Sequence, residues 1–464
     1  MCLAMRYSRC GSYILSLVFL ASGVWAEEPA ESSIPDTPPP SRFIHWLRED
    51  LHVSGTLAVE SAIELRDGDL QKFETLLEPE FELSLPRDSQ LTIIPRLRWD
   101  PADELAPDQP SQESSSGYNR SLNIGDTLEL ELREAYFQTP IRDSFLTIGK
   151  QQVVWGEADG LKVLDVVNPQ DYREFILDDF DDSRIPLWTV KAEIPIKSAT
   201  LQLLWIPDPT HHRIPDEDAT YEFVSNVPQA PPGVPVIVDD VDRPSNPISD
   251  SDAGAQLSAM WGGWDFTFNY LYQYDDIPVL YRTITPGPGG TSITVDPGYE
   301  RTHVIGGSFS NAFGDLTLRG EFAYKVDKRF SVDDATDLDG VVSADEAGYV
   351  LGLDWFGFSE TFLSAQFFQS ILTDDASGLL RDQVENYLTF LVQRDFLNDA
   401  LVVSNIWIHN INHGDGVVRP SIKYEVRDNL ELSAGVDWFY GTDRGLFGQY
   451  GDATRVVLGM KVGF

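Results

Sequence analysis

The final stretch of the chain, Asp452 to Phe464, alternates between two kinds of side chain at every position. Successive side chains of a β-strand point to opposite faces, so a strand here has one apolar face and one face of charge and glycine. The apolar face carries Val456, Leu458, Met460, Val462 and Phe464, and the opposite face carries Arg455, Val457, Gly459, Lys461 and Gly463. Two environments suit this pattern: the edge of a soluble sheet, or a wall between lipid and water.

The same alternation recurs in segments that end in residues 275, 327, 427 and 440. In the first of them, aromatic side chains from Trp264 to Tyr274 alternate with Asp265, Thr267 and Asn269. Charged rows of this kind are costly in a packed core and favourable beside water. The repeated pattern therefore favours a membrane barrel with a wet interior over a two-sheet soluble sandwich.

Short and long connections alternate between the predicted strands, as in up-and-down barrels with short periplasmic turns and long extracellular loops. Short turns are predicted around residues 87–88, 141–142, 197–198, 262–263, 311–314, 357–359, 398–399 and 428–429. Longer connections are predicted at 66–71, 102–123, 157–186, 208–252, 276–299, 328–347, 373–383, 412–416 and 441–451. We therefore predict an all-β, transmembrane, antiparallel barrel of about 18 strands over residues 51–464, with 16 strands as the alternative.

The amino terminus has the features of a secretory signal peptide. Arg6 and Arg9 precede an apolar stretch at 14–21, and small residues end it at Ala26. We expect cleavage after residue 26, followed by a Pro-rich periplasmic leader with a short amphipathic turn at 27–50. Both cysteines, Cys2 and Cys10, lie in the predicted signal peptide, so no disulfide or thiolate metal site is expected.

The composition excludes some classes of function. A formal net charge of −40 makes nucleic acid a poor partner, because phosphate binding needs a basic surface. The abundance of aromatic residues, with 25 Phe and 17 Tyr, argues against a disordered acidic chain. His211 and His212 are adjacent and so do not share a face as a metal pair would, and no catalytic spacing is found around other histidines. We predict that the protein is not an enzyme.

Two stretches resemble known proteins. The carboxy-terminal strand is similar to the closing strand of bacterial outer-membrane barrels, which implies that Phe464 is read by the barrel assembly machinery. Gly149, Lys150, Gln151, Trp155, Gly156, Asn168 and Pro169 resemble an uncharacterised family of proteobacterial outer-membrane, porin-like barrels marked by G-[RK]-Q-x-x-x-W-G and a later N-P. This resemblance implies a location in the outer membrane of a Gram-negative bacterium and passage of small or lipid-like molecules.

The 157–186 segment is too long and too apolar in places for a solvated loop. We expect it to enter the lumen and narrow the pore, an external lid being the alternative. Its polar residues would then set the field at the constriction: Glu157, Asp159, Lys162, Asp165, Asn168, Asp171, Arg173, Glu174, Asp178, Asp179, Asp181, Asp182 and Arg184.

Basic residues on the inward faces of the predicted strands would oppose this acidic loop. They are Arg96, Arg98, Arg133, Lys150, Arg319, Lys325, Arg419, Lys423, Arg427 and Lys461. A basic wall that faces an acidic loop produces an electric field across the pore, and this field would orient dipolar solutes. The alternative is that these charges pair into networks that stiffen the barrel.

Residues 333–346 resemble a calcium loop in part, with Asp337, Asp339, Gly340 and Glu346 at ligand spacing. Ala335 occupies the position of the first ligand, and Asp334 would replace it by a slip of one residue. The alternative to weak calcium binding is a solvated acidic loop. No other cofactor is expected.

The sequence thus predicts a porin-like outer-membrane channel or facilitator for small solutes. A non-conducting surface protein or exporter partner is one alternative, and a barrel for hydrophobic or lipid-like molecules is another. Expected partners are outer-membrane lipids and lipopolysaccharide, the assembly machinery and a small solute, with a homotrimer or an exporter as further candidates.

Overall fold

The computed structural model describes residues 50–464 except 109, 159, 226–227, 229, 288–289, 334–336 and 375–377. The predicted signal peptide at 1–26 and the leader at 27–50 lie outside the described residues, apart from Asp50.

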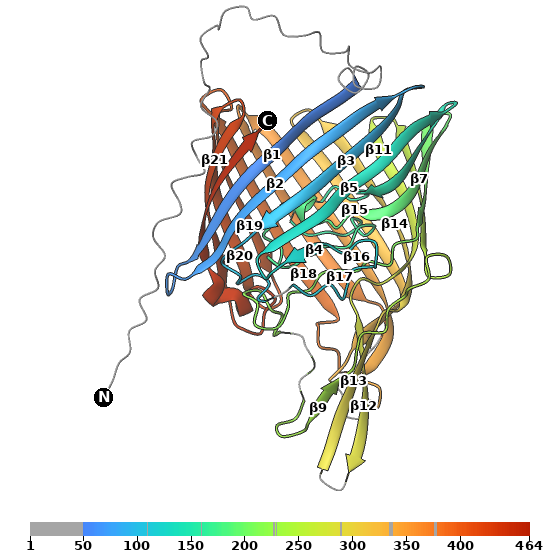
Figure 1. Cartoon of the computed structure of the whole chain (residues 1–464), viewed down its shortest axis with the longest axis vertical. Coiled ribbons are helices and arrows are strands. Elements are labelled where there is room, and N and C mark those ends of the chain that lie inside the picture. Colours follow the sequence, from blue (N-terminus) through green and yellow to red (C-terminus); the bar gives the residue numbers. More distant parts are fainter. Residues whose placement is uncertain are drawn as a thin grey trace, which may run out of the picture. The chain divides into compact units, whose positions relative to one another are not determined.

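Within the described part of the chain, eighteen strands pair side by side into a closed antiparallel barrel (Figure 1). In chain order these strands are β1 (Leu51–Glu64), β2 (Leu70–Leu85), β3 (Ser89–Trp99), β5 (Leu128–Ile141), β6 (Ser144–Gln151), β7 (Leu187–Ile196), β8 (Ala199–Ile206), β10 (Asp252–Trp261), β11 (Trp264–Tyr274), β14 (Arg301–Phe313), β15 (Leu316–Ser331), β16 (Val341–Phe358), β17 (Thr361–Leu372), β18 (Val384–Phe396), β19 (Leu401–Asn410), β20 (Asp415–Arg427), β21 (Leu430–Tyr440) and β22 (Arg455–Gly463). The prediction of an all-β barrel with 18 strands is confirmed, and the 16-strand alternative is not.

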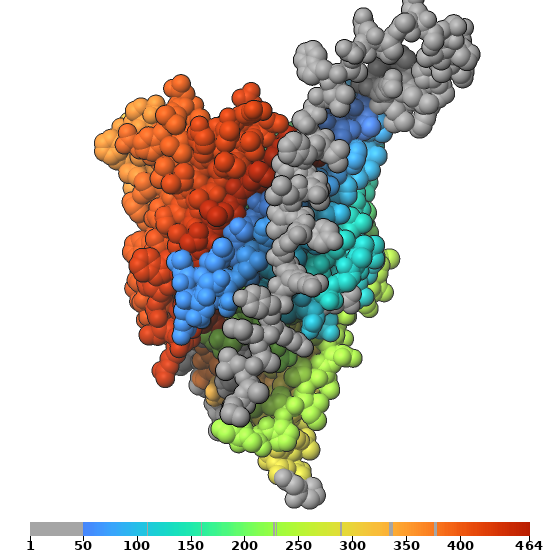
Figure 2. Space-filling view, turned by 60° about the vertical axis from the view of Figure 1, so that its left-hand side comes forward, coloured from blue at the N-terminus to red at the C-terminus, as the bar shows by residue number. Residues whose placement is uncertain are grey.

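The first and last strands close the barrel. β1 pairs with β22 from Thr56 opposite Gly463 to Glu64 opposite Arg455. Beyond this ladder, the Phe464 N–H donates to the Gly55 carbonyl at 3.0 Å, and the Gly55 N–H donates back at 3.0 Å. Figure 2 shows the blue first strands directly beside the red last strands on the outer surface. Closure leaves the sheet without a free edge.

The alternation of side chains sets the two faces of the wall. In β22, Leu458 and Met460 are exposed on the outside, whereas Arg455 is buried on the inside. In β20, Ile422 and Tyr424 are likewise exposed. Apolar side chains therefore face outward and charged side chains face inward, as the period of two requires.

The connections at the two ends of the barrel differ. At one end, tight turns join the strands, and left-handed residues such as Arg87, Asp88, Gly262 and Gly263 make two of these turns possible. At the other end, the short strand β4 (Leu122–Ile124) pairs with β5, and a small sheet of β9 (Val236–Val238), β12 (Val279–Gly287) and β13 (Gly290–Gly298) extends away from the barrel (Figure 1).

Two short helices lie in connections: α2 (Phe180–Ser183) between β6 and β7, and the 3₁₀-helix η1 (Gly448–Ala453) before β22. Among the described residues, none of the helices combines the length and the hydrophobicity needed to cross a membrane.

Candidate functional site in the barrel lumen

The connection from β6 to β7, residues 152–186, lies inside the barrel; we call it the inserted segment. Its described residues contact inward-facing side chains on widely separated strands. The Trp155 indole donates to Gln202 on β8 at 2.7 Å, Arg96 on β3 donates to Asp182 at 2.7 Å, and Arg419 on β20 donates to the Leu177 carbonyl at 2.6 Å. Because these strands lie on different sides of the wall, the segment crosses the lumen.

Two residues of the motif G-[RK]-Q-x-x-x-W-G and its later N-P, Gly149 and Asn168, have structural roles at the inserted segment. Gly149 has φ of 139°, and a Cβ there would overlap the Ala135 carbonyl on the adjacent strand. Asn168 is buried, and its side chain accepts from the Val153 N–H at 2.7 Å and donates to the Ile185 carbonyl at 2.8 Å. One side chain thus joins the beginning and the end of the segment.

Replacement of Asn168 by Ala is expected to loosen the inserted segment while leaving the barrel assembled. The change leaves the buried Val153 N–H without a partner, at a cost of about 1–3 kcal/mol, and removes the hydrogen bond to the half-buried Ile185 carbonyl. Hydrogen exchange of residues 152–186 measures this loss of protection. Asn429→Ala, in an exposed turn where the side chain donates only to the Gly463 carbonyl, is the matched control. Equal protection in both variants contradicts the structural role of Asn168.

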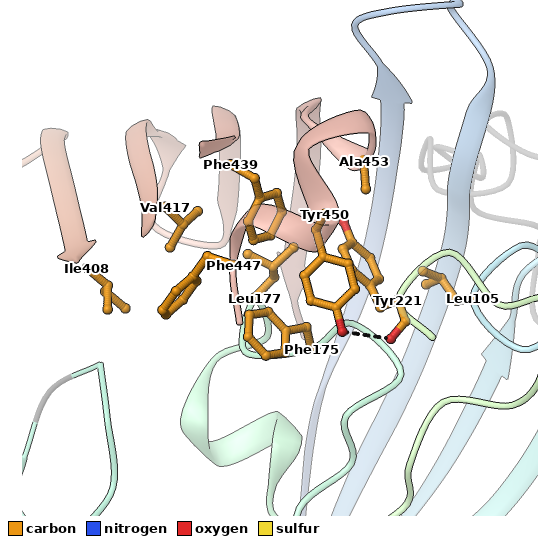
Figure 3. Close-up of a cluster of buried hydrophobic side chains, with 10 residues drawn as sticks. All are labelled: Leu105, Phe175, Leu177, Tyr221, Ile408, Val417, Phe439, Phe447, Tyr450 and Ala453. Atoms are coloured by element: carbon orange, nitrogen blue, oxygen red, sulfur yellow. Dashed lines mark hydrogen bonds between the residues drawn. The ribbon is translucent and has the colours of Figure 1, made fainter. Parts of the chain in front are cut away.

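Two apolar clusters hold the inserted segment against different parts of the wall. In one, Val153, Trp155, Leu164 and Val167 pack against strands from β7 to β15. In the other, Phe175 and Leu177 pack against β19–β21 and η1, as Figure 3 shows. Its members are Leu105, Phe175, Leu177, Tyr221, Ile408, Val417, Phe439, Phe447, Tyr450 and Ala453, and the Tyr450 hydroxyl donates to the Tyr221 carbonyl at 3.1 Å. Apolar burial within the lumen therefore positions the polar groups beside it.

Glu174 is the most enclosed charge of the inserted segment, with side-chain exposure of 2%. Its carboxylate pairs with Lys72 on β2 and, at 2.7 Å, with Arg455 on β22. Burial alone raises the pKa of Glu174, but Lys72 and Arg455 outweigh it and hold that pKa below its usual range. Arg455 also pairs with Asp437 on β21 at 2.8 Å. The segment is thus tied by charge to the seam where the barrel closes.

A second group of charges ties the inserted segment to β5. Arg173 pairs with Glu129 at 2.9 Å and with Asp171 at 2.7 Å, and Arg213 contacts the same two carboxylates. Burial raises the pKa of Asp171, but Arg173 and Arg213 reverse the shift and hold the pKa below its usual range.

The structure brings most of the predicted wall residues into contact with carboxylates or with the inserted segment. Arg96 pairs with Glu78 and Asp182, Arg98 with Glu74, Arg419 with Asp437, and Arg319 with Asp354. Arg133 donates to the Asp181 and Asp182 carbonyls, and Lys150 donates to the Leu132 carbonyl at 2.7 Å. Lys325 lies 4.0 Å from Glu346. Lys423, Arg427 and Lys461 are exposed, toward the end of the barrel with the tight turns.

The predicted residues of the inserted segment have varied surroundings. Glu157 accepts from Arg319 through its carbonyl, and its N–H donates to Glu321. Lys162 lies 3.3 Å from Asp165, which also pairs with Arg184, and Arg184 reaches Asp181. Asp178 borders a cavity and Asp179 is exposed. Asp159 lies outside the described residues.

Some described basic residues of the lumen were not among the predicted set; they include Lys72, Arg213, Lys328 and Arg455. Arg455 lies on the charged face of the closing strand, so the alternation of side chains was sufficient to predict that Arg455 faces the lumen. Lys328 was hidden by a bulge in β15, where the pairing shifts between Lys325 and Lys328 and Asp327 has φ of 63°. Both lysines therefore reach Glu346, at 4.0 and 3.4 Å.

The sequence matches, over residues 100–384, the family described as "Protein of unknown function (DUF1302)". The chain belongs to this family. No match is found among curated proteins. The fold of this DUF1302 protein is similar to those of several solved outer-membrane proteins at low sequence identity. The OccK5 (OpdH) structure of Pseudomonas aeruginosa shares 10% identity, with coverage of 90% of this chain and 98% of that one and a TM-score of 0.48.

Two other solved structures are similar to the DUF1302 protein. The outer membrane channel DcaP of Acinetobacter baumannii shares 8% identity, covering 89% of this chain and 97% of that one, with a TM-score of 0.43. A mutant porin of Rh. blastica shares 11% identity, covering 89% of this chain and 100% of that one, with a TM-score of 0.39. The strand pairing, rather than these likenesses, establishes the barrel.

The structure describes three of the four residues of the predicted calcium site in the DUF1302 protein: Asp337, Asp339 and Glu346. Glu346 lies in β16 and pairs with Arg381 at 2.8 Å and with Lys328, while Asp337 accepts from the Gly340 N–H. Asp339 lies in the same turn as Asp337, and Asp334 lies outside the described residues. Among the residues that can be described, no group of three His, Cys, Asp or Glu side chains is placed to hold a metal ion.

The inserted segment leaves a cavity of about 940 Å³ along one part of the wall. Strands β15–β18 border it on one side, through residues such as Ala323, Gly348, Phe368 and Tyr387, and the inserted segment borders it on the other. Residues from 212–225, Pro228 and residues from 277–280 also line it. Within the described lumen, this cavity lies between the inserted segment and strands β15–β18.

Proposed function

We propose that this DUF1302 protein is an outer-membrane channel or facilitator through which small solutes pass, and that the inserted segment narrows its lumen. The observation that carries the proposal is the fixed crossing of the lumen by residues 152–186, tied by ion pairs to β2, β3, β5 and β22. A barrel of this strand number is wide enough to enclose an aqueous path. A segment fixed across that path by buried charges and apolar clusters acts as a constriction.

The charges of the lumen support a polar path on the side of the tight turns. Lys423 and Lys461 are exposed there on inward-facing positions, and Lys461 lies opposite Glu431 in the β21–β22 pairing. Arg427, predicted to face inward, lies beyond a register shift that pairs it with Leu430 of the outward face. Solvated charges of both signs suit a water-filled lumen. Apolar side chains on the outside of the barrel would face lipid, which supports a location in the outer membrane.

Recording from the purified barrel in planar lipid bilayers tests this function. We expect stable single-channel steps, and a reversal potential in a salt gradient reports whether the basic wall or the acidic segment sets the charge selectivity. Properly inserted barrels that give no steps, with or without the inserted segment, would overturn the channel and favour a non-conducting surface protein or exporter partner.

A further inference from the structure

The 940 Å³ cavity between the inserted segment and β15–β18 has a mainly apolar lining. Aromatic and aliphatic side chains enclose it from both sides: Leu161, Val163, Tyr172, Phe175, Ile176, Phe180, Phe223, Ile277, Leu280, Ala323, Phe368 and Tyr387. Cavities that hold small organic ligands measure roughly 300–1,000 Å³ and combine such walls with a few polar groups. A lumen that passes only ions and polar solutes has no need of an apolar hollow of this size.

Lys325 borders the cavity, and it shares its carboxylate partner Glu346 with two other cations. Lys325 retains 25% exposure of its side chain, and its nearest carboxylate, Glu346, lies 4.0 Å away. Glu346 is engaged more closely by Arg381 at 2.8 Å and by Lys328 at 3.4 Å. Lys328 also pairs with Asp275 at 3.2 Å. Among these three cations, Lys325 has the longest contact to a carboxylate and reaches the cavity.

Four carboxyl groups of the described residues border the cavity: Glu346, which is shared by Lys325, Lys328 and Arg381, and those of Asp178, Glu217 and Glu222. Burial, together with the nearby Glu174 carboxylate, raises the pKa of Asp178 to about 8, so Asp178 is largely uncharged at neutral pH. Glu217 and Glu222 belong to the segment 212–225, where Glu222 accepts from the Asp218 N–H. Lys162, on the inserted segment, adds a second cation, which lies 4.3 Å from the centre of the Phe180 ring.

We propose that this cavity binds a hydrophobic carboxylic acid, with its apolar body between the inserted segment and β15–β18 and its carboxylate at Lys325. The inference rests on the proposed function, since it names the class of solute that the constriction would admit. Apolar contacts supply most of the affinity, and the charge-assisted contact at Lys325 selects the acid over a neutral molecule of the same size.

Decanoate binding to the full-length mature barrel in lipid nanodiscs, measured by calorimetry against empty nanodiscs, tests the apolar part of the site. Gly348→Trp fills the cavity, because a Cβ on Gly348 meets no atom closer than 3.9 Å and its φ is not left-handed. We expect saturable binding to the wild type and its loss in this variant. Gly451→Trp, at an exposed glycine of η1 with open space around it, is the control and keeps binding.

Lys325→Gln tests the acid group. Loss of a charged hydrogen-bond partner predicts affinity for decanoate weaker by roughly tenfold or more, with binding of 1-decanol little changed. Lys423→Gln removes a lumen lysine that does not border the cavity, and it should bind decanoate like the wild type. Equal affinity for decanoate and 1-decanol in the wild type, unchanged by Lys325→Gln, would overturn the assignment of an acid.

The result of this experiment is independent of the test of the channel. No saturable binding of decanoate to heat-modifiable, folded barrels overturns the cavity proposal even if the protein conducts. Binding without conductance in planar bilayers overturns the channel and leaves the ligand site standing.

Discussion

Deletion of residues 160–183 is expected to raise the single-channel conductance several-fold. These residues include α2 and the central part of the inserted segment, which packs against β19–β21 through Phe175 and Leu177. The wall is held by strand pairing that runs without interruption from β1 to β22, so the barrel does not depend on them for closure. Without them, the lumen has the cross-section of the barrel itself.

A deletion at the same end of the barrel but outside the lumen is the control. The deletion removes residues 284–293, of which 284–287 and 290–293 are described and pair at the far end of β12 and β13, in the small sheet that extends away from the barrel (Figure 1). Their removal should leave the conductance near that of the wild type. Conductance that stays the same after deletion of 160–183, in barrels that insert and migrate as folded protein, would show that this segment does not limit the current.

Replacement of Glu174 by Ala is expected to release the inserted segment from the closing seam of the barrel. Removal of one partner from a buried ion pair costs about 3–5 kcal/mol, because the remaining charges stay buried. Lys72 keeps Glu60 at 2.9 Å and Arg455 keeps Asp437 at 2.8 Å, which places the expected cost toward the lower end of that range. The free energy of local opening, measured by hydrogen exchange over residues 152–186, should fall accordingly. Channel recordings should show larger and noisier current steps.

Glu425→Ala provides a comparison for this prediction. Glu425 also faces the lumen, but it is exposed and lies near the tight turns, far from the inserted segment along β20. Exposed charges contribute little to stability, so exchange in the inserted segment should not change. The opening free energy of Glu174→Gln should lie between those of Glu174→Ala and Glu425→Ala, since the amide oxygen of Gln can still accept one hydrogen bond. Opening free energies for Glu174→Ala within error of the wild type would refute the anchoring role.

The barrel itself was predictable because its pattern is local. Each strand needs only alternating side chains, and each tight turn needs only a few residues with suitable backbone conformations, such as Gly262 and Gly263. The faces of β11 and β22 therefore follow directly from their sequences. Register shifts are exceptions: the bulge at Asp327 reverses the faces of the residues after it and brings Lys328 to the inside, and a shift in β20 pairs Arg427 with Leu430.

The candidate site was predictable only as a set of charges, and its pairing was not. Glu174 lies 102 positions from Lys72 and 281 from Arg455, so nothing in the local sequence relates them. Nor does the local sequence relate Glu346 to Arg381, which comes from the connection between β17 and β18.

By itself, the amino-acid sequence determined that this chain forms a closed wall of alternating strands with charge on the inside. It did so because side-chain direction in a strand depends only on position along the chain. Only the tertiary structure decided which wall residues hold the inserted segment, and that an apolar cavity remains beside β15–β18. Those features depend on how a long connection fills the lumen, where ion pairs and apolar contacts join residues that are distant in sequence.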